Sequence, residues 1–203
     1  MLHANTVHEY TLELLKRIES DSKLNFFYLA GGTALALQIG HRISVDLDFF
    51  SHHDFNENDI SEYLISNFNA QIVSIANNSI SCLINNIKVE FIAHQYPLLK
   101  ENNIIDNIRL ASFEDIAAMK INAARNRGTK KDFVDLYFLL KSYSIQSLLE
   151  FANKKYPNHI DLLTLKSLVY FEEANQEPDC QMLLDVNWEE VKNALENEIT
   201  PLI

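Results

Sequence analysis

The segment that most constrains the fold of this sequence is residues 30–50, AGGTALALQIGHRISVDLDFF. A short apolar run at residues 26–30 predicts a buried strand that stops at a pair of glycines. Residues 33–37 predict a short helix that Gly40 closes, and residues 45–50 alternate between apolar and acidic side chains as a strand does. A strand, a helix and a strand in so short a span indicate that the first half of the chain has an α/β-type core.

Two aspartates, Asp46 and Asp48, lie two positions apart on the second predicted strand. Side chains alternate between the faces of a strand, so we expect both carboxylates on one face and Val45, Leu47 and Phe49 on the other. Two close negative charges repel each other unless a cation lies between them, and ligands that are all oxygen suit Mg²⁺ or Mn²⁺ rather than Zn²⁺. The pair therefore predicts a metal site, and the alternative is a solvated strand face.

A glycine pair, Gly31 and Gly32, stands between the first strand and the short helix. Glycine lets the backbone come close to a ligand, and the free N–H groups and the dipole of a helix N-terminus attract anions. We therefore expect Gly31, Gly32 and Thr33 to hold phosphate oxygens beside the metal site, and the alternative is a simple tight turn. Arg42 and Ser44, which come just before the metal strand, are expected to add phosphate contacts.

The next part of the chain predicts a helix and three further strands. Asp54 and Glu57 resemble a capping box for a helix that reaches about residue 68, and an earlier helix is expected at residues 5–20. Two Asn-Asn pairs suit tight turns because asparagine tolerates positive φ. They separate three predicted strands: residues 71–76, 79–84 and 87–93.

The order Gly-Gly, short helix and Asp-x-Asp strand resembles the signature of polymerase-β-type nucleotidyltransferases. The resemblance implies a third carboxylate on a neighbouring strand, and Glu90, between the apolar Val89 and Phe91, is the candidate. The alternative for Glu90 is a solvated strand face on which it pairs with a cation such as Lys88.

Two longer blocks resemble the AbiEii/AbiGii toxin family within that superfamily. The first consists of residues 31–37 and 42–49, and the second is residues 120–140. The family pattern of the second block is a Lys, an Arg and then Lys-Asp-x-x-Asp. In this sequence it falls on Lys120, Arg127, Lys131, Asp132 and Asp135.

The resemblance implies an α+β fold, with a polymerase-β-like nucleotidyltransferase core that has a small mixed sheet, followed by an all-helical C-terminal half. The residue pattern agrees, because it is helical from Ser112 to the end. We predict a nucleotidyltransferase core at residues 1–100 and, at residues 101–203, a helical domain that completes the nucleotide site. The boundary is expected near residues 95–111.

Charged residues of the second block have candidate roles in binding the nucleotide. Lys120 and Arg127 lie seven positions apart on one helix face, and we expect them to bind the leaving phosphates, with Lys131 in the same site. Asp132 and Asp135 share a face of the next helix. We expect them to hold the basic side chains of this block in place, and Asp135 is also a candidate to take a proton. The alternative is a pair of solvated helices with ordinary salt bridges.

The resemblance implies an Mg²⁺-dependent (or Mn²⁺-dependent) enzyme that transfers NMP from an NTP to an acceptor hydroxyl and releases pyrophosphate. Asp46, Asp48 and Glu90 would hold the metal, and Glu90 or Asp135 would take the proton. By resemblance, the chain is expected to be the toxin of a type IV toxin–antitoxin or phage-defence system, with RNA such as tRNA as the acceptor and a DNA-binding antitoxin as partner. The alternatives are transfer to a small molecule or a protein, and a catalytically silent interaction module with the same fold.

Charge and hydropathy limit the expected partners and location. The formal net charge of -11 disfavours sequence-independent binding of nucleic acid, which relies on Lys and Arg. The first residues lack a basic segment followed by an apolar one, and no apolar run is long enough to span a bilayer. We therefore expect a cytoplasmic protein with no membrane partner, in which Cys82 and Cys180 are reduced thiols.

Overall fold

The computed structural model describes residues 1–157 and 162–203. The chain forms two compact units, which we name the sheet unit and the helical unit. The sheet unit consists of Met1–Gln38, Ser44–Pro97 and Asn102–Ala111. The helical unit consists of Ile39–Ile43, Leu98–Glu101 and Ser112–Ile203.

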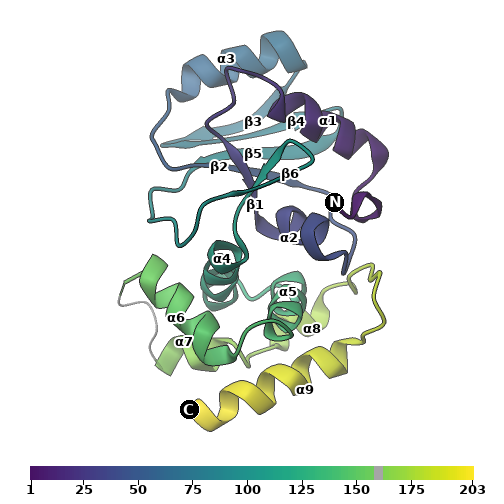
Figure 1. The fold of residues 1–203 in the computed structure, drawn as a ribbon, viewed down its shortest axis with the longest axis vertical. Helices are drawn as coiled ribbons and strands as arrows, with labels where there is room; N and C mark the ends of the chain where they lie inside the picture. Colours follow the sequence, from purple (N-terminus) through teal and green to yellow (C-terminus); the bar gives the residue numbers. More distant parts are fainter. Residues whose placement is uncertain (158–161) are drawn as a thin grey trace. The chain divides into compact units, whose positions relative to one another are not determined.

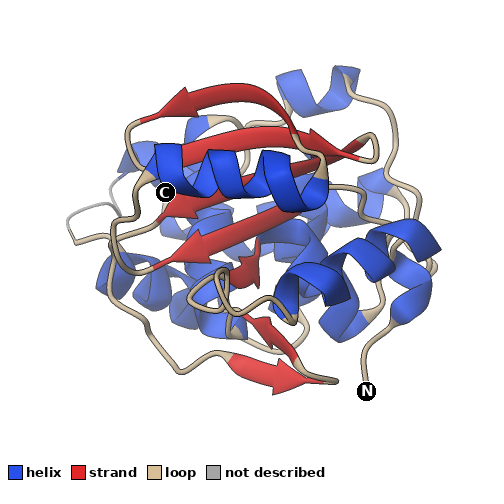
Figure 2. Cartoon of the chain, turned by 90° about the horizontal axis from the view of Figure 1, so that it is seen from above, coloured by secondary structure: helices blue, strands red, loops and turns tan. Residues whose placement is uncertain are grey.

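The described part of the sheet unit contains one mixed sheet of seven strands, drawn in red in Figure 2. Their order is β3-β4-β5-β2-β1-β7-β6. The pairs β2–β5 and β1–β7 are parallel, and the other neighbours are antiparallel. The mixed sheet confirms the predicted α+β fold class. The strands are β1 (Tyr28–Ala30), β2 (Leu47–Ser51), β3 (Gln71–Ala76), β4 (Ser79–Ile84), β5 (Ile87–Ala93), β6 (Asn103–Ile105) and β7 (Ile108–Leu110).

Helices cover both faces of this sheet: α1 and α3 lie over one face, and α2 lies over the other (Figure 1). The face under α1 and α3 is apolar. Phe49 and Phe91 are fully buried there, and their rings stack with centroids 5.3 Å apart. Burial of each such side chain contributes about 1.5–3 kcal/mol, which fixes which face of β2 and β5 points inward. The helical elements of this unit are η1 (Ala4–Thr6), α1 (Glu9–Glu19), α2 (Gly31–Ile39) and α3 (Glu57–Phe68).

The predicted asparagine turns between β3, β4 and β5 are confirmed. Asn78 has a φ of 59°, and Asn85 and Asn86 have φ values of 52° and 64°. These are left-handed conformations that asparagine tolerates better than most residues. The three strands begin and end at the predicted residues.

A hairpin that was not predicted occupies part of the expected boundary segment. Strands β6 and β7 are joined by Asp106 and Asn107, whose φ values are 52° and 63°. Because β7 pairs with β1, residues 103–110 belong to the sheet. The last change from the sheet unit to the helical unit along the chain comes between Ala111 and Ser112.

Some element boundaries also differ from the expectation. Strand β2 begins at Leu47, so Val45 precedes the strand and is 64% exposed instead of facing the core. Helix α3 is capped by the side chain of Asn56, which accepts N–H groups of the first turn, rather than by Asp54. Helix α1 begins at Glu9.

A buried acid, Glu19, ends α1. Its side chain accepts the backbone N–H of Arg109 at 3.1 Å and pairs with the Arg109 guanidinium at 3.0 Å, while its Oε1 has no hydrogen-bond partner. Burial raises the pKa of Glu19 from 4.5 to about 7, against the opposing effect of Arg109. The carboxyl is therefore largely neutral in mildly acidic solution and ionises as the pH passes neutrality.

Glu19 should make the protein less stable as the pH rises. A group with a raised folded-state pKa contributes stability that is complete below its unfolded value and is lost as the pH rises through the folded value. We expect Glu19→Gln, which mimics the protonated acid, to be on the order of 2 kcal/mol more stable than the wild type at about pH 8.5, with no difference at about pH 3.5, below the unfolded pKa. Urea denaturation at both pH values measures this. Glu13→Gln, an exposed acid of the same helix, is the control; a Glu19→Gln difference independent of pH would contradict the assignment.

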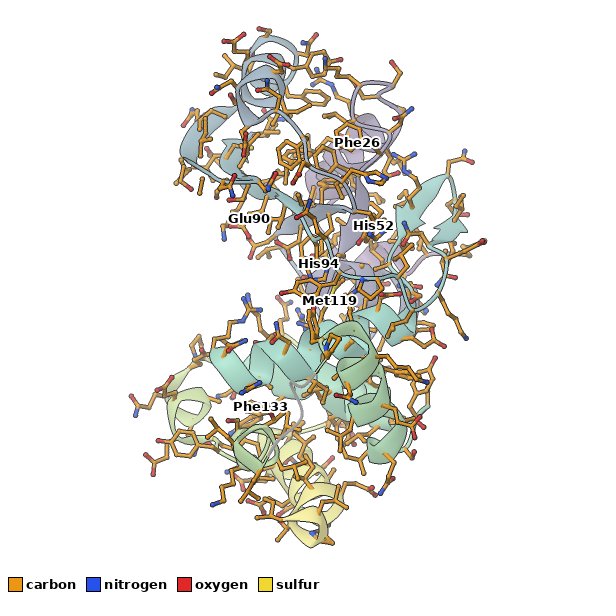
Figure 3. All side chains as sticks on the ribbon, turned by 90° about the vertical axis from the view of Figure 1, so that its left-hand side faces the viewer. Phe26, His52, Glu90, His94, Met119 and Phe133 are labelled. Carbon is orange, nitrogen blue, oxygen red and sulfur yellow. The ribbon has the colours of Figure 1, made fainter. Side chains whose placement is uncertain are left out.

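Apart from an isolated bridge between Arg42 and Met182, the regular elements in the described part of the helical unit are helices. Ser112 caps α4, since its hydroxyl accepts the N–H of Asp115 at 3.0 Å as predicted. Phe133 of α5, labelled in Figure 3, packs against Phe171 and Trp188 with centroid distances of 4.9 and 6.2 Å. None of the helices in the described ranges is long and apolar enough to cross a membrane. The elements are α4 (Phe113–Asn126), α5 (Lys130–Leu140), α6 (Ile145–Lys155), α7 (Leu162–Ser167), α8 (Glu172–Gln176), α9 (Trp188–Ile199) and η2 (Thr200–Leu202).

Candidate active site

The predicted acidic residues lie on two neighbouring strands of the sheet unit. Asp48 of β2 is in register with Glu90 of β5, and the two strands are parallel. Their neighbours Leu47 and Val89 are fully buried, so alternation places both acidic side chains on the opposite face, which α2 covers. Asp46 lies two residues before Asp48, immediately ahead of β2. Glu90 is visible on its strand in Figure 3.

Gly31 lies against the carboxylate of Asp48. A Cβ atom built at Gly31 would be 2.6 Å from Asp48 Oδ2, and the φ of Gly31 is +67°. Any other residue would meet both the carboxylate and a strained backbone. The start of α2 therefore lies beside the carboxylate of Asp48. The partial positive charge of a helix N-terminus favours a negative group at this place. The binding of phosphate by Gly31 and Gly32 stays a prediction.

The two glycines of α2 should respond differently to alanine. We expect Gly31→Ala to lower the free energy of unfolding by about 1–3 kcal/mol, because φ is positive and the Asp48 carboxylate must move. Gly32→Ala is the comparison: Gly32 is helical without a positive φ, and alanine favours a helix by up to about 1 kcal/mol. Denaturant unfolding of both variants measures the difference. Equal stability of Gly31→Ala and the wild type would show that the close approach to Asp48 relaxes without cost.

Thr33 and Ser44 support the acidic strand from inside the sheet unit. The Thr33 hydroxyl donates to the backbone oxygen of Asp46, and the Ser44 hydroxyl lies 2.8 Å from the Thr33 hydroxyl. The backbone N–H of Ser44 donates to Thr6 at 2.8 Å. Thr33 is 1% exposed and Ser44 is 9% exposed. Both hydroxyls thus make hydrogen bonds within the sheet unit, and the phosphate contacts predicted for Thr33 and Ser44 stay predictions.

Lys88 lies beside the acidic residues; the sequence analysis considered it only as a cation that pairs with Glu90 on a solvated strand face. Its Nζ lies 2.9 Å from Glu90 Oε1, and its side chain is 49% exposed. The hydrogen bond to Glu90 raises the pKa of Lys88, and the charges of Glu90, Asp46 and Asp48 add to this effect. The charges of all three carboxylates therefore stabilise the protonated form of Lys88. The signal in the sequence is its position two residues from Glu90, which places both on one face of β5.

The acidic residues fit a divalent cation by their chemistry. Asp46, Asp48 and Glu90 offer only carboxylate oxygens, the donors that Mg²⁺ and Mn²⁺ prefer. Asp48 and Glu90 share one face of the sheet, and the charges of all three carboxylates act on the ammonium group of Lys88. Within residues 1–157 and 162–203, however, no three His, Cys, Asp or Glu side chains converge closely enough to hold a metal ion. Glu90 is engaged by Lys88 in this conformation.

Lys120 and Asp132 of the second block are buried in the helical unit. Lys120 Nζ lies 2.9 Å from Asp132 Oδ1 and 2.6 Å from Asp135 Oδ2, and only 5% of its side chain is exposed. The charges of the two aspartates raise the pKa of Lys120 although burial alone would lower it. The Lys120 ammonium is thus paired with two carboxylates of α5, and its predicted contact with the nucleotide stays a prediction.

Asp135 is fully buried and accepts hydrogen bonds from three side chains. Arg42 donates to it from Nε at 2.7 Å and from Nη2 at 2.8 Å, His41 donates from Nε2 at 2.7 Å, and Lys120 is the third. Burial would raise the pKa of Asp135, but the charges of Lys120 and Arg42 and the hydrogen bonds hold it well below the ordinary value. Asp135 and Arg42 thus form an internal ion pair. The predicted catalytic role of Asp135 and the predicted phosphate contact of Arg42 stay predictions.

Arg127 and Lys131 are the exposed members of the second block. Arg127 is 57% exposed and pairs with Asp132 through Nε at 2.9 Å and Nη2 at 3.1 Å. The Thr129 hydroxyl donates to the same carboxylate at 2.6 Å. The nucleotide contacts predicted for Arg127 and Lys131 stay predictions.

Comparison with known proteins identifies the family of this chain. The sequence matches the family described as "Nucleotidyl transferase AbiEii toxin, Type IV TA system" over residues 13–201. It is 36% identical over 193 residues to the uncharacterized protein aq_aa25 of Aquifex aeolicus (strain VF5), a match that covers 92% of this chain and 93% of that protein.

The fold is similar to those of solved nucleotidyltransferase structures. JHP933 from Helicobacter pylori matches with a TM-score of 0.55 and 22% identity, over 97% of this chain and 93% of that chain. ANT(2'')-Ia in complex with adenylyl-2''-tobramycin matches with a TM-score of 0.59 and 11% identity, over 74% of this chain and 99% of that chain. The family match and these folds confirm the predicted resemblance. The chain belongs to the nucleotidyl transferase AbiEii toxin family and is a nucleotidyltransferase.

Proposed function

We propose that the chain transfers NMP from an NTP to an acceptor hydroxyl, with Mg²⁺ or Mn²⁺ held by Asp46, Asp48 and Glu90. The observation that carries the proposal is the register of Asp48 and Glu90 on adjacent parallel strands. Asp46 precedes them on the same chain segment, and Gly31 starts a helix beside Asp48. These positions gather an acidic group and a helix N-terminus in the sheet unit, as a metal–triphosphate ligand requires.

Each residue of the sheet unit has a separate task in this reaction. A bound divalent cation offsets the charge of the triphosphate and lowers the pKa of the acceptor hydroxyl. Asp46 and Asp48 would bind the cation, and the N–H groups of Gly31 and Gly32 would bind phosphate oxygens of the NTP. The hydroxyl attacks the α-phosphorus as the bond to pyrophosphate breaks. Glu90 takes the proton, for which it must separate from Lys88.

The biological role is proposed from the family. We propose that the chain is the toxin of a type IV toxin–antitoxin or phage-defence system, that it acts in the cytoplasm, and that a DNA-binding antitoxin is its partner. RNA such as tRNA is the proposed acceptor. Arg127 and Lys131 of the helical unit remain the candidates for contacts with phosphate groups, because they are exposed cations.

A small-molecule acceptor is the second candidate. The net charge of -11 works against a polyanionic acceptor. ANT(2'')-Ia, which shares the fold, was solved with an adenylylated small molecule.

Calorimetry with each of the four NTPs, with and without Mg²⁺, tests the proposed function. We expect one or more NTPs to bind only when Mg²⁺ is present, and the folded variant Asp46→Ala/Asp48→Ala to bind none. Labelled NTP is then incubated with total RNA, with protein and with small-molecule extracts. Label in RNA supports the first candidate, and label confined to small molecules supports the second. A folded wild type that binds no NTP would favour a silent interaction module.

A further inference from the structure

The chain segment that leads into the acidic strand is held by the helical unit. Residues Ile39–Ile43 belong to that unit, although they connect α2 to β2. The N–H of Ile43 donates to Gln181 at 2.9 Å, and the N–H of Leu183 donates to His41 at 2.9 Å. An antiparallel bridge joins Arg42 to Met182 between these two bonds. The backbone of this segment is therefore fixed on a short extended strip of the helical unit.

The side chains of the same segment converge on one carboxylate. Arg42 makes a two-pronged contact with Asp135 at 2.7 and 2.8 Å, and the imidazole of His41 adds a third bond at 2.7 Å. The exposed fractions of the Arg42 and Asp135 side chains are 4% and 0%. A planar guanidinium that meets a carboxylate with two parallel bonds fixes orientation as well as distance. Arg42 is therefore held in one geometry.

The carboxylate itself is fixed by the neighbouring helix. Lys120 of α4 lies 2.6 Å from Asp135 and 2.9 Å from Asp132, both on α5. Lys120 therefore ties α4 to α5 at the level of Asp135. Lys120 and Asp132 thus hold the Asp135 carboxylate that the guanidinium of Arg42 contacts.

The acidic strand begins directly after this anchored segment. Asp46 is four residues after Arg42, and Ser44, between them, is bonded to Thr6 and Thr33 within the sheet unit. The Thr33 hydroxyl also holds the backbone oxygen of Asp46. Ile43 is thus bonded within the helical unit, and Ser44 and Asp46 are bonded within the sheet unit.

We propose that Asp135 is a positioning residue, which acts through Arg42 to hold the backbone that carries Asp46 and Asp48. The inference rests on the proposed function of those two aspartates. It assigns Lys120 and Asp135 to the support of the acidic strand, and not to contact with the nucleotide. A displacement of about 1 Å in a reacting group can cost on the order of 100-fold in rate, so a loss of this anchor should be seen in turnover.

Arg42→Lys tests the proposal with the positive charge retained, so that the variant folds. We expect amide hydrogen exchange of a peptide covering residues 42–48 to rise about tenfold or more in the nucleotide-free variant, because one ammonium replaces the two-pronged contact. We expect kcat to fall about 10- to 100-fold while the KM for NTP changes less than about twofold. Arg17→Lys, at an exposed arginine of α1, is the matched control and should alter neither quantity.

The two readouts separate this proposal from the proposed function. Unchanged exchange, or a rise in KM with unchanged kcat, would overturn the positioning role and point to a direct contact with the nucleotide. Faster exchange in Arg42→Lys with no turnover by the wild type would support the anchor and count against the enzyme. Arg42→Lys combined with Asp135→Asn should lose no more activity than the more damaging single variant, since both act through one contact; additive losses would also overturn the proposal.

Discussion

Asp48→Asn is expected to lower the rate of nucleotidyl transfer by about 1000-fold or more while leaving the fold intact. The substitution keeps the shape of the side chain and removes its charge. Asp48 is the residue that the register places beside Glu90 and that lies against Gly31 at the start of α2. A single-turnover assay with labelled NTP, at saturating Mg²⁺ and at saturating Mn²⁺, measures the loss.

Asp59→Asn is the control for this substitution, because Asp59 is an exposed aspartate near the start of α3. It should retain the wild-type rate. The circular dichroism and unfolding midpoints of both variants should match those of the wild type, since surface substitutions usually change stability by less than about 0.5 kcal/mol. A folded Asp48→Asn variant with the wild-type rate would remove Asp48 from the metal site and end the proposed assignment of the acidic group.

Local patterns predicted the sheet unit well because its signals are short-range. The alternation of apolar and acidic residues around Asp48 and Glu90 identified two strands, each with its acidic side chain on one face. In the structure these strands are neighbours, and Asp48 is in register with Glu90. Asparagine pairs identified the turns, since positive φ is a property of the residue itself. The hairpin at Asp106 and Asn107 carries the same kind of signal, and only its short strands, of three residues each, hid it from the pattern.

The helical unit was predicted less well, because its charged residues depend on partners far away in sequence. His41 and Asp135 are 94 residues apart, and no spacing rule relates them. Lys120 lies on an otherwise apolar helix, a pattern that suits a lysine with a role in binding. The same pattern also describes a buried face, and there a lysine must be paired with acids. The sequence alone does not show which acids pair with Lys120; the structure shows that they are Asp132 and Asp135 of α5.

Asp135→Asn is expected to be among the most destabilising single substitutions in the helical unit. Removal of the carboxylate leaves the guanidinium of Arg42 buried without a counter-charge, and it removes one of two acids from Lys120. Breaking a buried ion pair from one side typically costs about 3–5 kcal/mol, a large share of the total stability of a typical domain, which is about 5–15 kcal/mol. Urea denaturation at neutral pH should show a midpoint shift of corresponding size.

The pH dependence of this loss distinguishes charge from packing. The pKa of Asp135 is held well below its ordinary value in the folded chain, so its contribution to stability is present above the unfolded pKa of about 3.9 and disappears as the pH falls through the folded value. The difference between wild type and Asp135→Asn should therefore be constant from neutral pH down to about pH 5 and shrink in stronger acid. Lys131→Met, which removes an exposed cation from the same helix, should change stability by less than about 0.5 kcal/mol. An Asp135→Asn variant as stable as the wild type at neutral pH would mean that Arg42 finds another partner or reaches water, and the anchor would lose its physical basis.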